Sequence, residues 1–378
     1  MIDERVDRLA RLVVEYSLDL REGQVLRIDA YEAAEPLIGA IYRAALHRGA
    51  HGYAQVMLEG LQELLVAEGS DEQVVYVSPI ERREIDVVDA VVTIWSRRNT
   101  RSFSNADPDR QQRLIAARRE LTNRLWDRIA RGEARWCGTL YPTHAHAQDA
   151  EMSLDEFERF VYGACHVLGD EDPVAHWRAV SRDLSGRASE LERVRELRVV
   201  GPDTDLRVSV DGRRWRAADG ELNMPDGEIF TSPVETETEG HIRFAFPAVF
   251  AGREVEDVRL RFEGGRVVDA EAAVGQDYLR SLLDMDDGAR VLGEVSFGCN
   301  YEIDRFTRDI LFDEKIGGTM HFAVGSGFKD LGSRNESGLH WDMICDLRSE
   351  GEVYADGELV WRNGAFLSEP QPAVERVG

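Results

Sequence analysis

The chain has 378 residues, of which 43% are hydrophobic and 31% charged, and its formal net charge at pH 7 is -25. This composition is typical of a globular protein, and the length predicts two domains because a single core rarely exceeds about 250–300 residues. The negative charge argues against binding to nucleic acid or to an anionic membrane, since basic patches drive such binding.

The first half of the chain alternates predicted helices and strands. Residues 3–17 carry apolar positions at helical spacing and lack the apolar segment of a signal peptide. Further helices are predicted over residues 33–50, 61–69 and 106–132, and strands over residues 24–30, 54–59 and 86–96. This order predicts an α/β domain with a largely parallel sheet. No glycine-rich phosphate loop follows any of the strands, which argues against nucleotide binding.

A helical connector follows over residues 138–195. Ser153 and Glu156 form a capping box that opens a helix, and two more helical stretches cover about 172–195. Upstream, the segment THAHAQDAE contains an HxH pair, which we interpret as a loop that enters a helix rather than a metal site. We place the domain boundary near the end of this connector, around residue 193, so that residues 1–193 form the first domain.

From Glu196 the chain changes to short strands and turns. Hairpins are predicted at Gly264-Gly265 and at Asp356-Gly357, and helices around residues 275–285 and 304–313. Residues 194–364 are therefore expected to form a second, β-rich α+β domain. The last residues, 365–378, are predicted to be a disordered tail. No stretch approaches the roughly 18 apolar residues of a membrane-spanning helix, and the four scattered cysteines predict reduced thiols in a cytoplasmic protein.

Two histidines and one aspartate in this second domain are candidate metal ligands. His340 and Asp342 are two residues apart in the strand-like run LHWDMICDL, so their side chains share one face of a strand. His321 lies in a second such run, HFAVG, directly after a Gly-Gly turn. Imidazole nitrogens and a carboxylate on neighbouring strands suit a divalent metal ion.

Two glutamates extend this set. Glu228 follows a Pro-Asp-Gly turn at the start of the run EIFTSP, and Glu294 lies between Leu292 and Val295. A carboxylate among apolar neighbours is costly to bury unless it is paired or bound to metal, although an exposed strand edge would also explain it. Together the five side chains could form a site for two cations about 3.5–4 Å apart, with a shared water as the nucleophile.

Four blocks of this sequence resemble the thermophilic-type metallo-aminopeptidase family (leucyl aminopeptidase, aminopeptidase T and aminopeptidase S). The blocks are NMPDGEIFTSP, LGEVSFG, DEKIGGTMHFAVGSGF and HWDMICDL, in this order, and the resemblance extends over nearly the whole chain. It implies a homodimer with two divalent metal ions per chain, bound by Glu228, Glu294, His321, His340 and Asp342. The ligand set suits Zn²⁺, Co²⁺ or Mn²⁺.

The resemblance also implies a tyrosine seven residues after the first ligand histidine, where this chain has Phe328. A phenyl ring has no hydroxyl to donate or to coordinate, so turnover should suffer more than metal binding. Lys315, just before the Gly-Gly turn, is either a surface lysine or a candidate electrophile or substrate anchor. Glu228 or Glu294 could bridge the metals, and one of them or an adjacent carboxylate would shuttle the proton.

The resulting hypothesis is a cytoplasmic metallo-aminopeptidase that removes N-terminal residues from peptides with a free amino group. Two alternatives stay open. His321, His340 and Asp342 also satisfy the two-histidine, one-carboxylate pattern of a mononuclear iron dioxygenase of the dihydroxypyridine type, which does not need the two glutamates. The second alternative is a hydrolase of non-peptide amides on the same scaffold, which the replacement of the implied tyrosine by Phe328 leaves open.

Overall fold

The structure, a computed structural model, describes residues 3–368, and these form two compact units. The first unit runs to His176 and includes Gly220–Pro225, and the second contains Trp177–Asp219 and the chain from Asp226 onward. The division falls inside helix α9 (Pro173–Leu191), whereas the sequence placed the domain boundary just after this helix.

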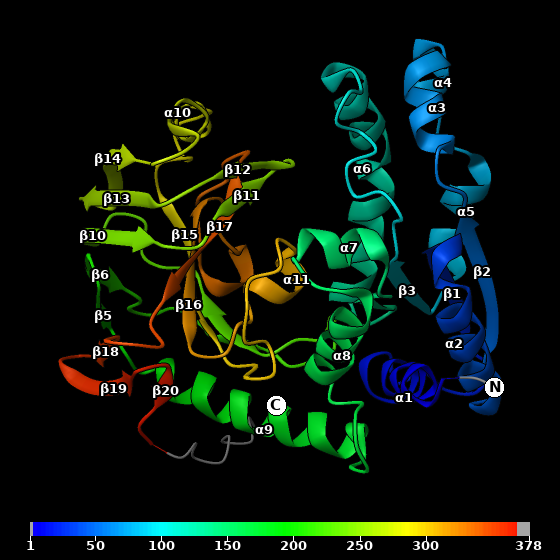
Figure 1. The fold of residues 1–378 in the computed structure, drawn as a ribbon, viewed down its shortest axis with the longest axis horizontal. Coiled ribbons are helices and arrows are strands. Elements are labelled where there is room, and N and C mark those ends of the chain that lie inside the picture. Colours follow the sequence, from blue (N-terminus) through cyan, green and yellow to red (C-terminus); the bar gives the residue numbers. More distant parts are fainter. Residues whose placement is uncertain (1–2, 369–378) are drawn as a thin grey trace. The chain divides into compact units, whose positions relative to one another are not determined.

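A five-stranded parallel sheet forms the centre of the first unit, in the order β2-β1-β3-β4-β8. Figure 1 labels three of its strands, β1, β2 and β3. Its strands are β1 (Val25–Tyr31), β2 (His51–Met57), β3 (Ala90–Trp95), β4 (Arg135–Leu140) and β8 (Asn223–Met224). The predicted α/β class with a largely parallel sheet is confirmed for this unit. The near-continuous apolar run in β3 is explained by its central position, where both faces of the sheet are covered.

Helices connect these strands. They are α1 (Glu4–Leu12), continued by a π-helical turn (Val13–Ser17), a 3-10 turn (Glu32–Ala34), α2 (Glu35–His47), α3 (Leu61–Glu68), α4 (Asp71–Val74), α5 (Pro79–Val87), α6 (Pro108–Ala130), α7 (His144–Asp149) and α8 (Leu154–Ala164). The strand predicted over residues 86–96 begins later, because α5 continues to Val87. The N-terminus of helix α5 is stabilised by Pro79 in its first turn and by a capping box between Ser78 and Glu81. The capping box predicted at Ser153 is confirmed at the start of α8.

The second unit contains two larger sheets and a two-stranded ribbon. The eight-stranded sheet has the order β14-β13-β10-β6-β5-β18-β19-β20, and the five-stranded sheet has the order β17-β16-β15-β9-β7. The strands are β5 (Glu196–Gly201), β6 (Thr204–Ser209), β7 (Arg216–Ala218), β9 (Glu228–Thr231), β10 (Thr238–Phe244), β11 (Ala248–Phe250), β12 (Arg253–Val255), β13 (Val258–Glu263), β14 (Arg266–Glu271), β15 (Leu292–Gly298), β16 (Thr319–Gly325), β17 (His340–Asp346), β18 (Glu352–Ala355), β19 (Glu358–Arg362) and β20 (Ala365–Phe366). Neighbouring strands pair antiparallel in both larger sheets, which confirms the predicted β-rich class.

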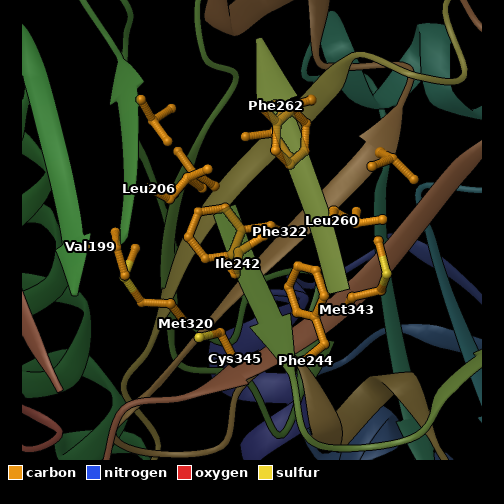
Figure 2. Packing of buried hydrophobic residues seen from close by; sticks show 14 of the residues in the cluster. Val199, Leu206, Ile242, Phe244, Leu260, Phe262, Met320, Phe322, Met343 and Cys345 are labelled. Carbon is orange, nitrogen blue, oxygen red and sulfur yellow. The ribbon is translucent and has the colours of Figure 1, made fainter. Parts of the chain in front are cut away.

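The two larger sheets enclose one hydrophobic core (Figure 2). Met320 and Phe322 of β16 pack with Ile242 and Phe244 of β10, and the rings of Phe244 and Phe322 meet edge to face at 6.3 Å. Because neighbouring residues of a strand point to opposite faces, burial of Met320 and Phe322 in this core directs His321 to the other face of the sheet. The core thereby fixes which residues can form a site.

Three further predicted segments differ from the structure. Residues 172–195 contain one helix, α9, rather than two. The helix predicted over 304–313 is reduced to α11 (Ile310–Asp313), because Arg308 has a left-handed backbone conformation, with φ of 65°, and the Asp313 carboxylate accepts hydrogen bonds from the backbone and side chain of Thr307. In the predicted tail, Ala365 and Phe366 pair with β19, and residues 369–378 lie outside the described residues. The other helices are α10 (Gln276–Leu283) and a 3-10 turn (Lys329–Leu331). In residues 3–368, no helix combines the length and the apolar character needed to cross a membrane.

Candidate metal centre

The five residues predicted as metal ligands come together on one face of the five-stranded sheet. The register places Ala323 of β16 between Glu294 of β15 and Asp342 of β17, and Gly325 opposite His340. On the other side of β15, Glu228 of β9 lies opposite Gly298. The residues that alternate with the candidate ligands on this face include Ala323, Gly325, Ser296 and Gly298, and these small side chains leave room above the sheet.

A β-bulge at Gly293 sets the direction of Glu294. Leu292 pairs with Val324 and Glu294 with Ala323, so two steps along β15 match one step along β16. Without this bulge, Glu294 would face the hydrophobic core together with Leu292, because residues two apart share a face. A Cβ atom at Gly293 would clash with the backbone carbonyls of Gly325 and Ser326, so this position requires glycine.

The histidine nitrogens and the carboxylate oxygens converge closely. His321 Nε2 lies 3.4 Å from Glu294 Oε1 and 3.5 Å from Glu228 Oε2. His340 Nε2 lies 3.3 Å from Glu294 Oε2 and 3.4 Å from Asp342 Oδ1. Glu294 therefore turns one oxygen toward each histidine. Its side chain is the link between two groups of possible ligands, one with Glu228 and His321 and one with His340 and Asp342.

Backbone carbonyls fix both imidazole rings. His321 Nδ1 donates to the carbonyl of Glu314 at 2.9 Å, and His340 Nδ1 donates to the carbonyl of Ser326 at 2.8 Å. Both rings therefore present Nε2 to the carboxylates. Metal-binding histidines commonly donate their second ring nitrogen to a carbonyl or carboxylate in this way, which fixes the tautomer and the ring orientation.

Glu228, Glu294 and His321 are buried, whereas His340 and Asp342 are partly exposed, and the charges of these side chains shift one another's pKa values. Burial raises the pKa of Glu228 to about 8, against the opposing effect of Lys315. Burial would also raise the pKa of Glu294, but hydrogen bonds with His321 and His340 outweigh it, and the net shift is downward. Likewise, burial lowers the pKa of His321, but Glu294 and Glu228 raise it to about 10. The imidazoles and carboxylates thus stabilise each other's charged forms in the absence of metal.

The residues present fit divalent metal ions. In each of three groups, the possible ligand atoms lie within 4.8 Å of one another. Asp342 Oδ1 is buried and makes no hydrogen bond of good geometry, although His340 Nε2 lies 3.4 Å away, and a cation would compensate this arrangement. Nitrogen and oxygen donors with no thiolate suit Zn²⁺, Co²⁺ or Mn²⁺, as the sequence suggested.

The third of these groups adds Glu314, which sequence reasoning missed. Glu314 can contribute an oxygen together with His321 and Asp342, and burial raises its pKa. The sequence signal that could have identified Glu314 is its position directly before Lys315 and seven residues before His321. The carboxylate reaches the centre only through the fold of the loop between α11 and β16, which no periodicity reveals.

Lys315 and Phe328 also lie at the centre. Lys315 is completely buried, contacts Glu314, and places Nζ 3.8 Å from Glu228 Oε1. Burial would lower its pKa, but Glu314 and Glu228 raise it, so Lys315 carries a fixed positive charge. The Phe328 ring stands edge to face with the His340 imidazole, with 5.7 Å between ring centres. The position that the resemblance assigned to a tyrosine is therefore beside a candidate ligand.

The HxH pair of the first unit has a structural explanation. His144 begins α7, and Thr143 caps this helix by accepting a hydrogen bond from the backbone of His146. Thr143 Oγ1 also lies 2.9 Å from His146 Nδ1. Neither histidine belongs to a metal-binding group within residues 3–368. The interpretation of this segment as the start of a helix is confirmed.

Similarity to known proteins extends over nearly the whole chain. A model of the family described as thermophilic metalloprotease (M29) matches residues 2–366. Aminopeptidase T from Thermus aquaticus is 29% identical, over 94% of this chain and 95% of that protein. Aminopeptidase 2 from Geobacillus stearothermophilus is 27% identical, over 97% of this chain and 98% of that protein.

Solved structures show the same fold. Wild-type AmpT from Thermus thermophilus superimposes with a TM-score of 0.85 at 24% identity, over 97% of this chain and 100% of that chain. The 2,5-dihydroxypyridine dioxygenase from Pseudomonas putida KT2440 gives a TM-score of 0.60 at 14% identity, over 99% of this chain and 100% of that chain. At these identities the two structures inform the fold alone.

Proposed function

The chain belongs to the thermophilic metalloprotease family M29, and from this premise we propose that it is an aminopeptidase that removes N-terminal residues from peptides with two divalent metal ions. The metallopeptidase class and the family resemblance predicted from the sequence are confirmed. Aminopeptidase activity is supported by the similarity to aminopeptidase T from Thermus aquaticus and to aminopeptidase 2 from Geobacillus stearothermophilus. The proposed ligands are Glu228, Glu294, His321, His340 and Asp342.

One observation carries the two-metal proposal. Glu294 directs Oε1 toward His321 Nε2 at 3.4 Å and Oε2 toward His340 Nε2 at 3.3 Å. A carboxylate that faces one histidine with each oxygen is suited to bridge two cations. Glu294 is therefore the proposed bridging residue, with Glu228 and His321 on one side and His340 and Asp342 on the other.

When bound, two such ions would lower the pKa of a shared water and polarise the scissile carbonyl. The residues of the chain would supply the rest of the mechanism. The fixed charge of Lys315 stabilises Glu228 as a carboxylate, and the negative side chains of the centre suit the free α-amino group of a peptide. Glu314, with its raised pKa, is the proposed carrier of the proton between water and leaving amine.

A substrate panel on metal-free protein reconstituted with single cations tests this function. We expect hydrolysis of leucyl-p-nitroanilide only after metal is restored, and no hydrolysis of the N-acetylated anilide. His340→Ala should lose both metal and activity. Retention of both by this variant would contradict the proposed centre.

The same panel separates the two alternatives. One iron per chain without hydrolysis would favour the dioxygenase, and hydrolysis of blocked but not free substrates would favour a non-peptide amide hydrolase. The identity of the metal, the homodimer implied by the family resemblance and the cytoplasmic location belong to the proposal as well. They are tested by metal analysis, by light scattering and by cell fractionation.

A further inference from the structure

A cleft of about 390 Å³ opens in the first unit, on one face of the parallel sheet. Strands β1 to β4 contribute its floor, and helices α5 and α6 contribute its walls. Its volume lies within the range of about 300–1,000 Å³ that small-molecule sites occupy. All of its lining residues are in the first unit, whereas the metal centre is in the second.

The strand register brings charged and aromatic side chains onto this face. Asp29 of β1 lies opposite Gln55 of β2 and Thr93 of β3, and all three line the cleft. Two residues earlier, Arg27 lies opposite Val91, which lies opposite Trp136 of β4. Since residues two apart in a strand share a face, these side chains form two adjacent rows across the sheet.

Two buried polar atoms of the cleft lack hydrogen-bond partners. Arg27 donates to Asp29 Oδ2 at 2.9 and 3.2 Å, which leaves Asp29 Oδ1 without a partner. From the opposite wall, Arg118 Nη1 of α6 is also buried and unpartnered, and Arg118 Nε is 3.9 Å from Glu81. Such unsatisfied groups are costly in a native structure, and here one acceptor and one donor line the same cleft.

The remaining wall is aromatic and apolar. Trp126 of α6 meets Trp136 edge to face, with ring centres 5.4 Å apart, and Trp136 Nε1 donates to Thr93 Oγ1 at 3.0 Å. The Trp136 ring is therefore held in place. Helix α6 itself is only partly covered, since Leu114 and Leu121 are the only fully buried residues among its 23. A ligand seated between α6 and the sheet would cover more of the α6 side chains that line the cleft.

We propose that this cleft binds a free amino acid with a large apolar side chain. The ligand's ammonium group would donate to Asp29 Oδ1, its carboxylate would accept from Arg118, and its side chain would pack against Trp126 and Trp136. The charged residues that line the cleft are two arginines and three carboxylates, so a molecule with no net charge and both signs fits better than an anion. The proposal does not rest on the peptidase activity, although amino acids would be products of that reaction.

Calorimetric titration of the metal-free, full-length protein with L-phenylalanine tests the site. Removal of metal weakens any binding at the metal centre. The result therefore tests the amino-acid cleft independently of the proposed aminopeptidase function. We expect saturable binding of one molecule per chain, and binding at least about tenfold weaker for L-phenylalaninamide and for N-acetyl-L-phenylalanine, because each lacks one charged group. Asp29→Asn and Arg118→Gln should weaken L-phenylalanine binding by a similar factor.

Arg119→Gln is the matched control, because Arg119 is the exposed neighbour of Arg118 on the same helix and does not line the cleft. Its affinity for L-phenylalanine should equal that of the unchanged chain. Thermal melting confirms that each variant is folded, and if one is not, the two modified ligands decide the question on the unchanged chain. Absence of saturable binding, binding that requires metal, or equal affinity for all three ligands would overturn the proposal.

Discussion

Gly293→Ala is expected to damage the metal centre through the backbone, without removing any ligand. The new Cβ would lie 2.7 Å from the carbonyl carbon of Ser326, and closer still to the carbonyl oxygens of Gly325 and Ser326, whereas ordinary contact begins at 3.4 Å. The Ser326 carbonyl is the group that accepts from His340 Nδ1 at 2.8 Å. Relief of the clash must therefore shift the bulge that directs Glu294, the carbonyl that orients His340, or both.

The magnitude follows from these contacts. Overpacking of a well-packed site costs about 1–3 kcal/mol of unfolding free energy. Loss of the orienting hydrogen bond to a ligand histidine typically lowers metal affinity about 10–100-fold. Urea unfolding measures the first effect, and competition with a chelator of known affinity measures the second.

Gly351→Ala provides the control. Its Cβ would lie 2.6 Å from Leu347 Cβ and 2.7 Å from Leu347 Cα, so it introduces a similar clash in the same unit, but Leu347 is not a ligand and orients none. We expect a comparable loss of stability with unchanged metal affinity. If Gly293→Ala were destabilised yet bound metal as tightly as the unchanged chain, the bulge would not position the centre, and the argument would be refuted.

Three further predictions concern the groups around the ligands. Phe328→Tyr supplies a hydroxyl beside His340, and if that hydroxyl polarises the reaction, kcat for leucyl-p-nitroanilide should rise about tenfold to a hundredfold, whereas unchanged kcat would show that this position does not contribute. Lys315→Met leaves Glu228 and Glu314 without their buried cation, so the metal-free chain should lose about 3–5 kcal/mol in urea unfolding and regain part of it with metal; equal stability would contradict the ion-pair role. Metal uptake should release protons, and metal affinity should rise with pH. Burial lowers the pKa of both histidines, but their carboxylate partners raise it to about 10 for His321 and about 12 for His340. Near neutral pH each histidine therefore carries a proton that a metal must displace. Calorimetry in buffers of different ionisation enthalpy measures the release, and pH-independent affinity would argue against it.

Much of the fold could be predicted because its local signals agree with its tertiary packing. The apolar run in β3 predicts the buried strand that forms there, and the capping box predicts the start of helix α8. Where the prediction was wrong, one local signal competed with another. Residues 86–87 have a strand-like pattern, yet they belong to α5, which starts at the capping box of Ser78 and extends to Val87. The segment before α11 has helical spacing, but Arg308 at positive φ and the hydrogen bonds from Thr307 to Asp313 hold it in an irregular turn.

The candidate centre was predictable in part for the same reason. His340 and Asp342 share a face because an unbroken strand has a period of two. The direction of Glu294 could not be predicted, since strict alternation from Leu292 would turn it into the core and only the bulge at Gly293 reverses this. Glu314 was missed because its contact with His321 and Asp342 depends on a loop conformation that leaves no pattern in the sequence.

The number of metal ions per chain tests the central claim most directly. Elemental analysis of reconstituted protein should give about two ions for the unchanged chain and at most about one for Glu294→Gln, since that residue is the proposed bridge. Glu294→Gln should also hydrolyse leucyl-p-nitroanilide more slowly, because it lacks the second ion. The control Glu271→Gln changes an exposed glutamate of β14 and should alter neither the metal content nor the rate of hydrolysis. Two ions and full activity in Glu294→Gln would contradict the bridged centre.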